Sequence, residues 1–159
     1  FNAEKWALQS ENSIDGEYDF ITASEEWKTH CCYDHDCEAI VYAVQAGGSL
    51  GRSHYVNGKF IASNLCLILT PKHNDKHPLN VCFYSIYLNS IRKQIVRELA
   101  DGTSKLTISL KDLMNYYVEY FPIKTQNSIV DFYTKTVVPK QEELKEAKQN
   151  LTNKINALL

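Results

Sequence analysis

The sequence predicts an α+β fold, in which a mixed domain with a β-rich core and one amphipathic helix is followed by a C-terminal helical, coiled-coil-like arm. Residues 38–70 have the pattern of three or four short strands separated by turn residues. Over residues 79–100 the apolar residues recur at steps of three and four, which is the period of a helix packed on one face. The last segment is helical in pattern and polar over most of its surface. We therefore expect one domain over residues 1–122 and an arm over residues 123–159.

Length and composition favour a globular protein with its own core. The chain has 159 residues, of which 44% are hydrophobic, and this suffices for one well-packed domain. No apolar run approaches the length of a membrane-spanning helix and no signal peptide opens the sequence, which begins at Phe1 in place of methionine and so reads as trimmed from something longer. The five cysteines form no recognisable disulfide framework. We expect a reduced, cytoplasmic protein without membrane contact.

The strand region is organised around a glycine-rich segment. A first strand is expected at residues 17–22, and the apolar residues 38–44 have the pattern of a buried strand. The glycines of residues 47–51 predict a tight turn that brings backbone close to a ligand. Asn57-Gly58 lies between two short extended runs and predicts a two-residue hairpin. The segment has the features of a recognition surface rather than of a reaction centre.

Glycine and proline are expected to bound the helices. The amphipathic helix over residues 79–100 is followed by Gly102, at a position suited to a helix C-terminal glycine. We expect residues 117–121 to form a strand. Pro139 is placed to occupy the first turn of a new helix that follows another helix over residues 123–138.

An apolar seam runs along the last segment at alternating steps of four and three residues. Its members are Leu144, Leu151, Ile155 and Leu158, with Lys148 at the missing seam position. This is a heptad pattern of under three repeats, and a single helix of this length needs a partner for stability. We expect the seam to be an oligomer or partner interface, with a homodimer through this helix as one arrangement. The alternative is a terminal helix folded on its own domain.

Charge is distributed unevenly along the chain, although the net charge is only −2. Residues 1–46 hold ten acidic and two basic residues, whereas residues 47–111 hold nine basic and three acidic ones. The glycine-rich segment lies in this basic middle part. Such a distribution indicates a nucleic-acid partner. The alternative is an ordinary mixed surface, since neighbours in sequence need not form one patch in space.

Three pieces of the sequence occur in a recognisable order. They are the segment GGSLGRSHYVNGKFIASNLCLIL, the helix ending in LADGT, and the run from LTISLKDL to FPIKTQNSI, where Pro122 and Gln126 precede a long helix. In this order and spacing, which cover roughly residues 15–159, they resemble one half of the DNA-specificity subunit of type I restriction–modification systems.

The resemblance implies a target recognition domain of mixed α/β structure followed by a helical spacer. A full subunit of that family has two of each and reads a bipartite site, so this chain would be a fragment, a half-subunit that dimerises, or part of a fused restriction–methylation enzyme. It implies sequence-specific binding of double-stranded DNA, which directs a methyltransferase subunit and a restriction subunit to the target. The sequence contains no Asn/Asp-Pro-Pro-Tyr/Phe methyltransferase motif and no paired carboxylates with lysine for cleavage. We therefore expect no cofactor and no catalytic residue.

The candidate DNA-contacting residues are polar or basic side chains in the basic middle part. Arg52 is the best placed to read a base, because a guanidinium binds guanine through two hydrogen bonds. The alternative for Arg52 is a surface arginine in a turn. Lysines suit phosphates, and the polar residues after the predicted helix are suited to the DNA backbone. The full set is Ser49, Arg52, His54, Lys59, Lys72, Thr103, Ser104 and Lys105.

The segment from His30 to Cys37 is the main competing site. It holds three cysteines and two histidines in eight residues, and both residue types bind zinc. Its spacing matches no structural zinc pattern, adjacent cysteines rarely bind the same ion, and no second ligand pair follows at a standard distance. We therefore expect a polar turn with partly buried thiols and no metal. The alternative function is a zinc-stabilised or helix-mediated protein-interaction module without DNA readout.

Overall fold

The computed structural model describes residues 1–5, 8, 14–45, 47–103 and 105–158 of the chain. The chain divides into two compact units, Phe1–Tyr120 and Phe121–Leu159, which are described separately below. Among the described residues, no helix combines the length and the apolar character needed to cross a membrane.

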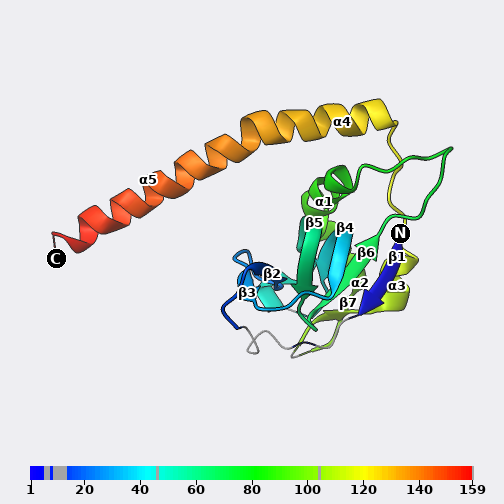
Figure 1. Ribbon diagram of the computed structural model, residues 1–159, viewed down its shortest axis with the longest axis horizontal. Coiled ribbons are helices and arrows are strands. Elements are labelled where there is room, and N and C mark those ends of the chain that lie inside the picture. Colours follow the sequence, from blue (N-terminus) through cyan, green and yellow to red (C-terminus); the bar gives the residue numbers. More distant parts are fainter. Residues whose placement is uncertain (6–7, 9–13, 46, 104, 159) are drawn as a thin grey trace. The chain divides into compact units, whose positions relative to one another are not determined.

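A six-stranded mixed sheet forms the centre of the first unit (Figure 1). Its strands are β1 (Asn2–Lys5), β2 (Tyr18–Ile21), β3 (Lys28–His30), β4 (His35–Ala43), β5 (Ser53–Ala62) and β6 (Cys66–Thr70). Their order across the sheet is β1-β6-β4-β5-β2-β3, and all neighbours are antiparallel except β5 and β2, which are parallel. The strands predicted around residues 17–22 and 38–44 are thus confirmed as β2 and β4.

The core of this unit lies on both faces of β4. Successive residues from Ala39 to Ala43 are fully buried, although neighbours in a strand point to opposite faces. On one face, Val41 belongs to an apolar cluster with side chains of β5 and β6. The helix α1 (Val81–Ser90) packs against β4 and β5 (Figure 1). Burial on two sides explains why the residues of β4 form an unbroken apolar run in the sequence.

β5 runs straight through Asn57-Gly58, so the hairpin predicted at this dipeptide is wrong. Gly58 has a φ of 116°, but Asn57 does not have a positive φ, whereas the Asn-Gly hairpin turn needs one at both positions. Asn57 and Gly58 instead pair with Glu38 and Cys37 of β4. The hairpin that joins β4 to β5 turns earlier, within the glycine-rich segment.

The amphipathic segment forms two helices where one was predicted. These are α1 and α2 (Arg92–Leu99), and Ile91 between them has φ −98° and ψ 9°. The Ser90 hydroxyl donates a hydrogen bond to the Tyr87 carbonyl at 2.7 Å. A side chain that bonds to the backbone of the preceding turn competes with helical hydrogen bonding, and this accounts for a break at the next residue.

Gly102 does not end α2, so that prediction is also wrong. The helix gives way directly to β7 (Ala100–Asp101), which pairs with β8 (Thr107–Ile108). Gly102, with a φ of 115°, turns the chain between these two strands. A Cβ at this position would lie 2.5 Å from the Lys105 carbonyl oxygen, so the tight strand connection requires glycine here.

The chain after β8 forms α3 (Leu110–Met114). The Ser109 hydroxyl caps this helix by accepting the Asp112 N–H at 3.0 Å. Residues 117–121 form no strand, contrary to the prediction. The Glu119 carbonyl accepts a hydrogen bond from a tyrosine side chain of α1 at 3.3 Å, so this stretch is held by a helix and not by a sheet neighbour.

The second unit is a helical arm (Figure 1). It consists of α4 (Ile123–Phe132), the π-helical segment η3 (Tyr133–Val137) and α5 (Val138–Asn156), which follow one another without a break. Pro139 lies in the first turn of α5, as predicted, although α5 continues from η3 without the break that a new helix would have. Proline lacks an N–H, and the wider π turn just before it accommodates the missing bond.

Candidate nucleic-acid interface

The connection between β4 and β5 is a tight loop that places two predicted DNA-contacting residues at one end of the sheet. We call residues 47–52 the glycine loop. Gly47 and Gly51 have φ values of 46° and 77°, and a 3-10 turn covers Gly47–Ser49. The Ala43 N–H donates to the Arg52 carbonyl, and the Gly51 N–H donates to the Ala43 carbonyl, both at 2.8 Å. These bonds close the loop and present Ser49 and Arg52 on a backbone of defined shape.

Arg92 of α2 stabilises the glycine loop through two hydrogen bonds to its backbone. Its Nε donates to the Leu50 carbonyl at 2.7 Å, and its Nη2 donates to the Gly48 carbonyl at 2.5 Å. A Cβ on Gly51 would lie 2.8 Å from a methyl carbon of Val96 and 3.2 Å from the Arg92 Cγ. The loop therefore lies directly on α2, and only glycine permits this approach.

Asn89 of α1 fixes the residue that follows the loop. Its side-chain oxygen accepts the Ser53 N–H at 2.9 Å, and its side-chain nitrogen donates to the Ser53 carbonyl at 2.7 Å. One amide thus satisfies both backbone groups at the start of β5. Neither Asn89 nor Arg92 is predicted as a site residue from the sequence, because nothing local to a helix indicates that its polar side chains bond to a loop elsewhere in the chain.

Arg52 is held only loosely. Its side chain is 23% exposed, and its Nη1 lies 4.0 Å from a carboxylate oxygen of Glu25, whose own side chain is 89% exposed. An ion pair of this length, with its carboxylate exposed to water, contributes little to stability. The guanidinium is therefore free to exchange Glu25 for an acceptor on a bound ligand.

His54 is covered by an aromatic neighbour. The Trp27 indole N–H donates to His54 Nδ1 at 3.2 Å, and the two rings meet edge to face with centroids 5.6 Å apart. Burial lowers the pKa of His54 from its ordinary value. The imidazole is therefore neutral near pH 7, and Trp27, which is 37% exposed, shields it.

A polar cleft of about 420 Å³ lies beside the glycine loop. Two lysines line it: Lys105, which is one of the predicted DNA-contacting residues, and Lys28, which is not among them. Ser49 and Ser63 contribute hydroxyls from the glycine loop and from the turn before β6. Two ammonium groups with neutral donors around an open hollow suit an anion such as a backbone phosphate. Thr103 is exposed in the turn that carries Lys105, while Ser104 lies outside the described residues.

Lys59 and Lys72 lie towards the other end of the sheet. Lys59 is seven positions beyond Arg52 along β5, so their backbones are at most about 23 Å apart. Its ammonium lies 4.7 Å from the centre of the Tyr33 ring, and a hydrogen bond to Tyr33 raises its pKa. β6 runs antiparallel to β4, so its last residues lie away from the glycine loop. Lys72 follows this end of β6 and is exposed. The structure thus brings together Ser49, Arg52 and Lys105 and separates these two lysines from them.

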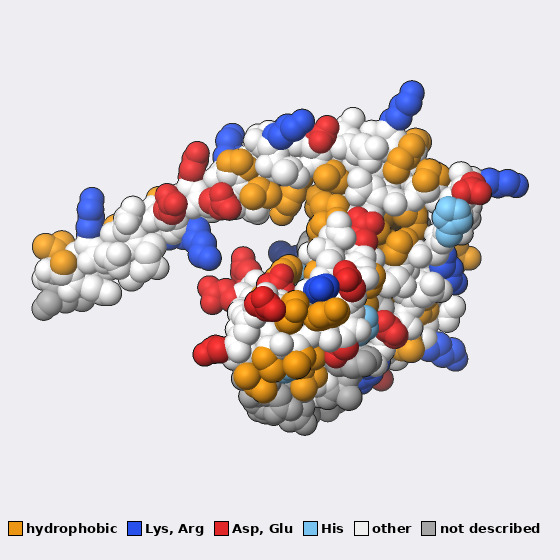
Figure 2. Space-filling model, in the orientation of Figure 1, with side chains coloured by type: hydrophobic (Ala, Val, Ile, Leu, Met, Phe, Trp, Pro, Cys, Tyr) orange, Lys and Arg blue, Asp and Glu red, His pale blue; other side chains and the backbone are white. Residues whose placement is uncertain are grey.

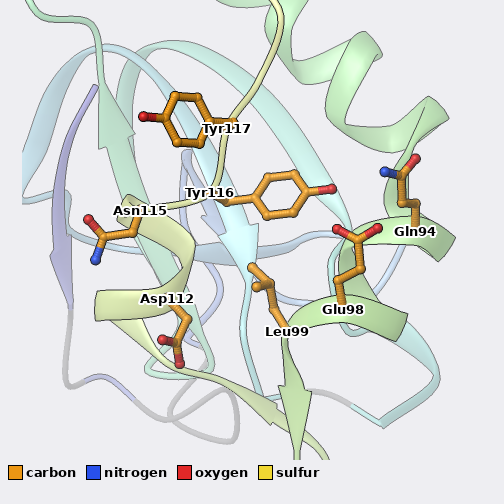
Figure 3. Close-up of a pocket in the computed structure, with 7 residues that line it drawn as sticks. All are labelled: Gln94, Glu98, Leu99, Asp112, Asn115, Tyr116 and Tyr117. Carbon is orange, nitrogen blue, oxygen red and sulfur yellow. The ribbon is translucent and has the colours of Figure 1, made fainter.

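A second hollow, of about 490 Å³, lies between α2 and the segment that follows α3 (Figure 3). Carboxylates of Glu98 and Asp112 line it together with the rings of Tyr116 and Tyr117. The Tyr116 hydroxyl points towards Glu98 in Figure 3. Burial, followed by the hydrogen bond to Glu98, raises the pKa of Tyr116. Because its charged lining is acidic, this hollow does not suit DNA phosphates.

The arm carries an exposed apolar stripe, of which Figure 2 shows the parts near the junction of α4 with α5 and at the C-terminal end. Leu151 is 59% exposed and Leu158 is 86% exposed, and the other two members of the predicted seam are exposed as well. Phe132 and Val137 continue the stripe towards α4, where they line an apolar hollow of about 350 Å³ with Leu144. The side chains of the seam are therefore not covered within the arm itself.

These features define a class of protein: an α+β binding domain with a firmly held loop at one end of its sheet, joined to a helical arm. The sequence matches the model of the type I restriction modification DNA specificity domain over residues 1–153, and the chain belongs to this family. Specificity subunits of type I restriction–modification systems are non-catalytic, and other subunits carry the enzymatic activities.

Solved structures share the fold. The S subunit of a type I system from M. genitalium has a TM-score of 0.70 and 19% identity, with 97% of this chain and 41% of that chain covered. A chain solved in work on complex assembly and conformational transition of the type I R-M system has a TM-score of 0.64 and 15% identity, with 99% and 40% covered. The HsdS subunit from Thermoanaerobacter tengcongensis has a TM-score of 0.58 and 17% identity, with 91% and 36% covered. The chain thus spans about two fifths of the length of these proteins. No curated protein sequence matches it.

Proposed function

We propose that this chain is a target recognition domain that reads double-stranded DNA through the glycine-loop end of its sheet. In this role it directs a methyltransferase subunit, and through it a restriction subunit, to a target site. The observation that carries the proposal is the glycine loop itself, which presents a loosely held Arg52 on a backbone that two helical side chains fix.

The two kinds of contact that DNA recognition needs lie side by side at this end of the sheet. Arg52 is suited to the base edges of the major groove, because its guanidinium forms two parallel hydrogen bonds to guanine. Lys28 and Lys105 in the adjacent polar cleft are suited to phosphates, which set the position of the protein on the duplex. Ser49 borders both. Lys59 and Lys72 lie outside the proposed interface because of their distance from Arg52.

The arm supports assembly. We assign residues 1–122 to recognition and residues 123–159 to a helical spacer, close to the observed division of the chain after Tyr120. The exposed seam would be covered by a second copy of the arm, by the second half of a longer subunit, or by the methyltransferase. Solved relatives more than twice as long as this chain leave room for a second recognition domain and a second spacer. We place the assembly in the cytoplasm, where its DNA substrate would be found.

The proposal is tested by binding to a library of duplexes with a randomised centre, since the target sequence is unknown. The chain, alone and with its methyltransferase partner, is expected to enrich a defined half-site at low salt and to lose affinity steeply as salt rises. For one domain with few phosphate contacts we expect a dissociation constant on the order of micromolar. Absence of binding at low salt, with the partner present, would refute DNA recognition.

Single substitutions then locate the interface. Arg52→Ala should reduce discrimination between the selected site and its variants by about 1–3 kcal/mol, while Lys105→Ala should weaken all duplexes alike. Lys59→Ala and Lys72→Ala are the matched controls, because they remove the same charge at the other end of the sheet and should leave affinity unchanged. A uniform loss with Arg52→Ala would assign it to phosphate contact instead of base reading.

A further inference from the structure

A cluster of metal-binding side chains lies where β3 ends. His30 is the last residue of β3, and Cys31 and Cys32 follow it in a turn. One ligand atom from each of the three lies within 4.8 Å of the others, and the two sulfur atoms are 3.5 Å apart. The cluster is separate from the glycine loop, although Lys28, two residues before His30 on β3, lines the cleft beside that loop.

The imidazole of this cluster is fixed before any ligand arrives. His30 is 9% exposed and meets the Phe20 ring edge-on, with centroids 6.0 Å apart. Its Nδ1 lies 3.1 Å from the Cys32 backbone nitrogen and 3.0 Å from the Cys32 carbonyl oxygen. With the proton on Nδ1 and donated to that carbonyl, the Nε2 lone pair is left for a metal ion. Gly16 packs so closely on the backbone of His30 and Cys31 that a Cβ at Gly16 would overlap it. The peptide carrying the cluster thus has a defined position, while both thiols are exposed and open to solvent.

The two sulfur atoms already lie close to the separation that a shared metal ion requires. Two thiolates bound to one tetrahedral zinc ion lie about 3.8 Å apart, given zinc–sulfur bonds of about 2.3 Å. The observed spacing of 3.5 Å needs only a small adjustment to reach this value.

We propose that His30, Cys31 and Cys32 form a binding site for one thiophilic metal cation of the zinc type, with solvent completing its coordination. The sequence pattern argued against a metal because its spacing matches no structural zinc pattern and adjacent cysteines rarely bind the same ion. In the structure the turn after β3 brings both sulfurs together beside a buried imidazole. The bound ion would tie the edge strand of the sheet to the turn that leads into β4. This inference does not depend on DNA recognition.

Cobalt(II) is the probe for this site, because its bonds to thiolates give a charge-transfer absorption that other ligands do not. The full chain is reduced, freed of metal and titrated with cobalt, and zinc is then added in competition. The wild type is expected to bind about one equivalent with a charge-transfer band that zinc abolishes. Zinc retained through purification would be measured by inductively coupled plasma mass spectrometry.

Cys31→Ser and Cys32→Ser should each weaken cobalt binding by more than about tenfold. Cys37→Ser is the matched control: it removes a nearby half-buried thiol outside the cluster and should leave the titration unchanged. Circular dichroism establishes that every variant is folded. We expect the substitutions at Cys31 and Cys32 to leave the fold intact, because both side chains are exposed. The proposal is overturned if the reduced, folded wild type shows no charge-transfer band. It is equally overturned if the band persists when both Cys31 and Cys32 are replaced.

Discussion

Replacing Arg92 by alanine removes the guanidinium that joins α2 to the glycine loop. The Leu50 carbonyl, on a residue that is 2% exposed, loses its hydrogen bond from Nε. A bond from a charged donor to a buried acceptor is worth about 1.5–3 kcal/mol. The Gly48 carbonyl belongs to an exposed residue, so water replaces that bond at little cost. We therefore expect Arg92→Ala to lower the free energy of unfolding by about 2 kcal/mol.

The effect should be concentrated in the loop. Hydrogen exchange should show faster exchange of the Leu50 and Gly51 amides, and urea denaturation should give the loss of stability. Arg92→Lys keeps the charge and the aliphatic stem, but one ammonium cannot reproduce the planar fork, so we expect about half the loss. Under the proposed function, Arg92→Ala should also blur discrimination among duplexes more than it lowers overall affinity, because a mobile loop no longer positions Arg52.

Arg97→Ala is the matched control, since Arg97 is an exposed arginine on the same helix. It should change stability by less than about 0.5 kcal/mol. The reasoning would be refuted if Arg92→Ala behaved like Arg97→Ala, with unchanged exchange at Leu50 and Gly51. In that case the two hydrogen bonds would not be what holds the loop.

Three other predictions concern the arm, one histidine and one thiol. Leu151→Lys places an ammonium in the exposed seam. Sedimentation should then show loss of self-association or of partner binding, while the first unit stays folded. An unchanged assembly state, with and without the partner, would mean that nothing covers the seam. Burial lowers the pKa of His54 in the folded protein, so the unfolded chain binds more protons in the range below the ordinary pKa of about 6.5. The stability that the neutral His54 contributes is therefore present above a pH of about 6.5 and is lost as the pH falls through the folded pKa. His54→Gln should flatten urea stability plotted against pH in this range, and an unaltered slope would count against a buried neutral imidazole. Burial raises the pKa of Cys66 to about 12, so a thiol reagent should label Cys66 only after unfolding. Cys31 and Cys32 are exposed and should react in the folded, metal-free, reduced protein. Mass spectrometry of the labelled peptides shows which of these cysteines reacted.

Elements with a periodic apolar pattern were predicted well, whereas the roles of two glycine positions were predicted wrongly. The apolar run of β4 and the helical period of the arm specify strand and helix whatever surrounds them. At Asn57-Gly58 and at Gly102, by contrast, glycine allows a positive φ in a strand, a hairpin or a helix end. Pairing of β5 with β4 decided the first case, and pairing of β7 with β8 decided the second.

The sequence by itself determined the α+β class, the helical arm with its seam, the glycine loop and the nearby Arg52. Tertiary structure alone decided what holds that loop and what lies beside it. Arg92 bonds to carbonyls 42 and 44 residues away, and Asn89 bonds to a residue 36 away. Lys28 reaches the polar cleft only because β3 and the β7–β8 turn are brought together around the sheet. Local patterns encode the preferences of the backbone, whereas the meeting of distant polar groups depends on how the helices pack on the sheet, and no short stretch of sequence contains that information.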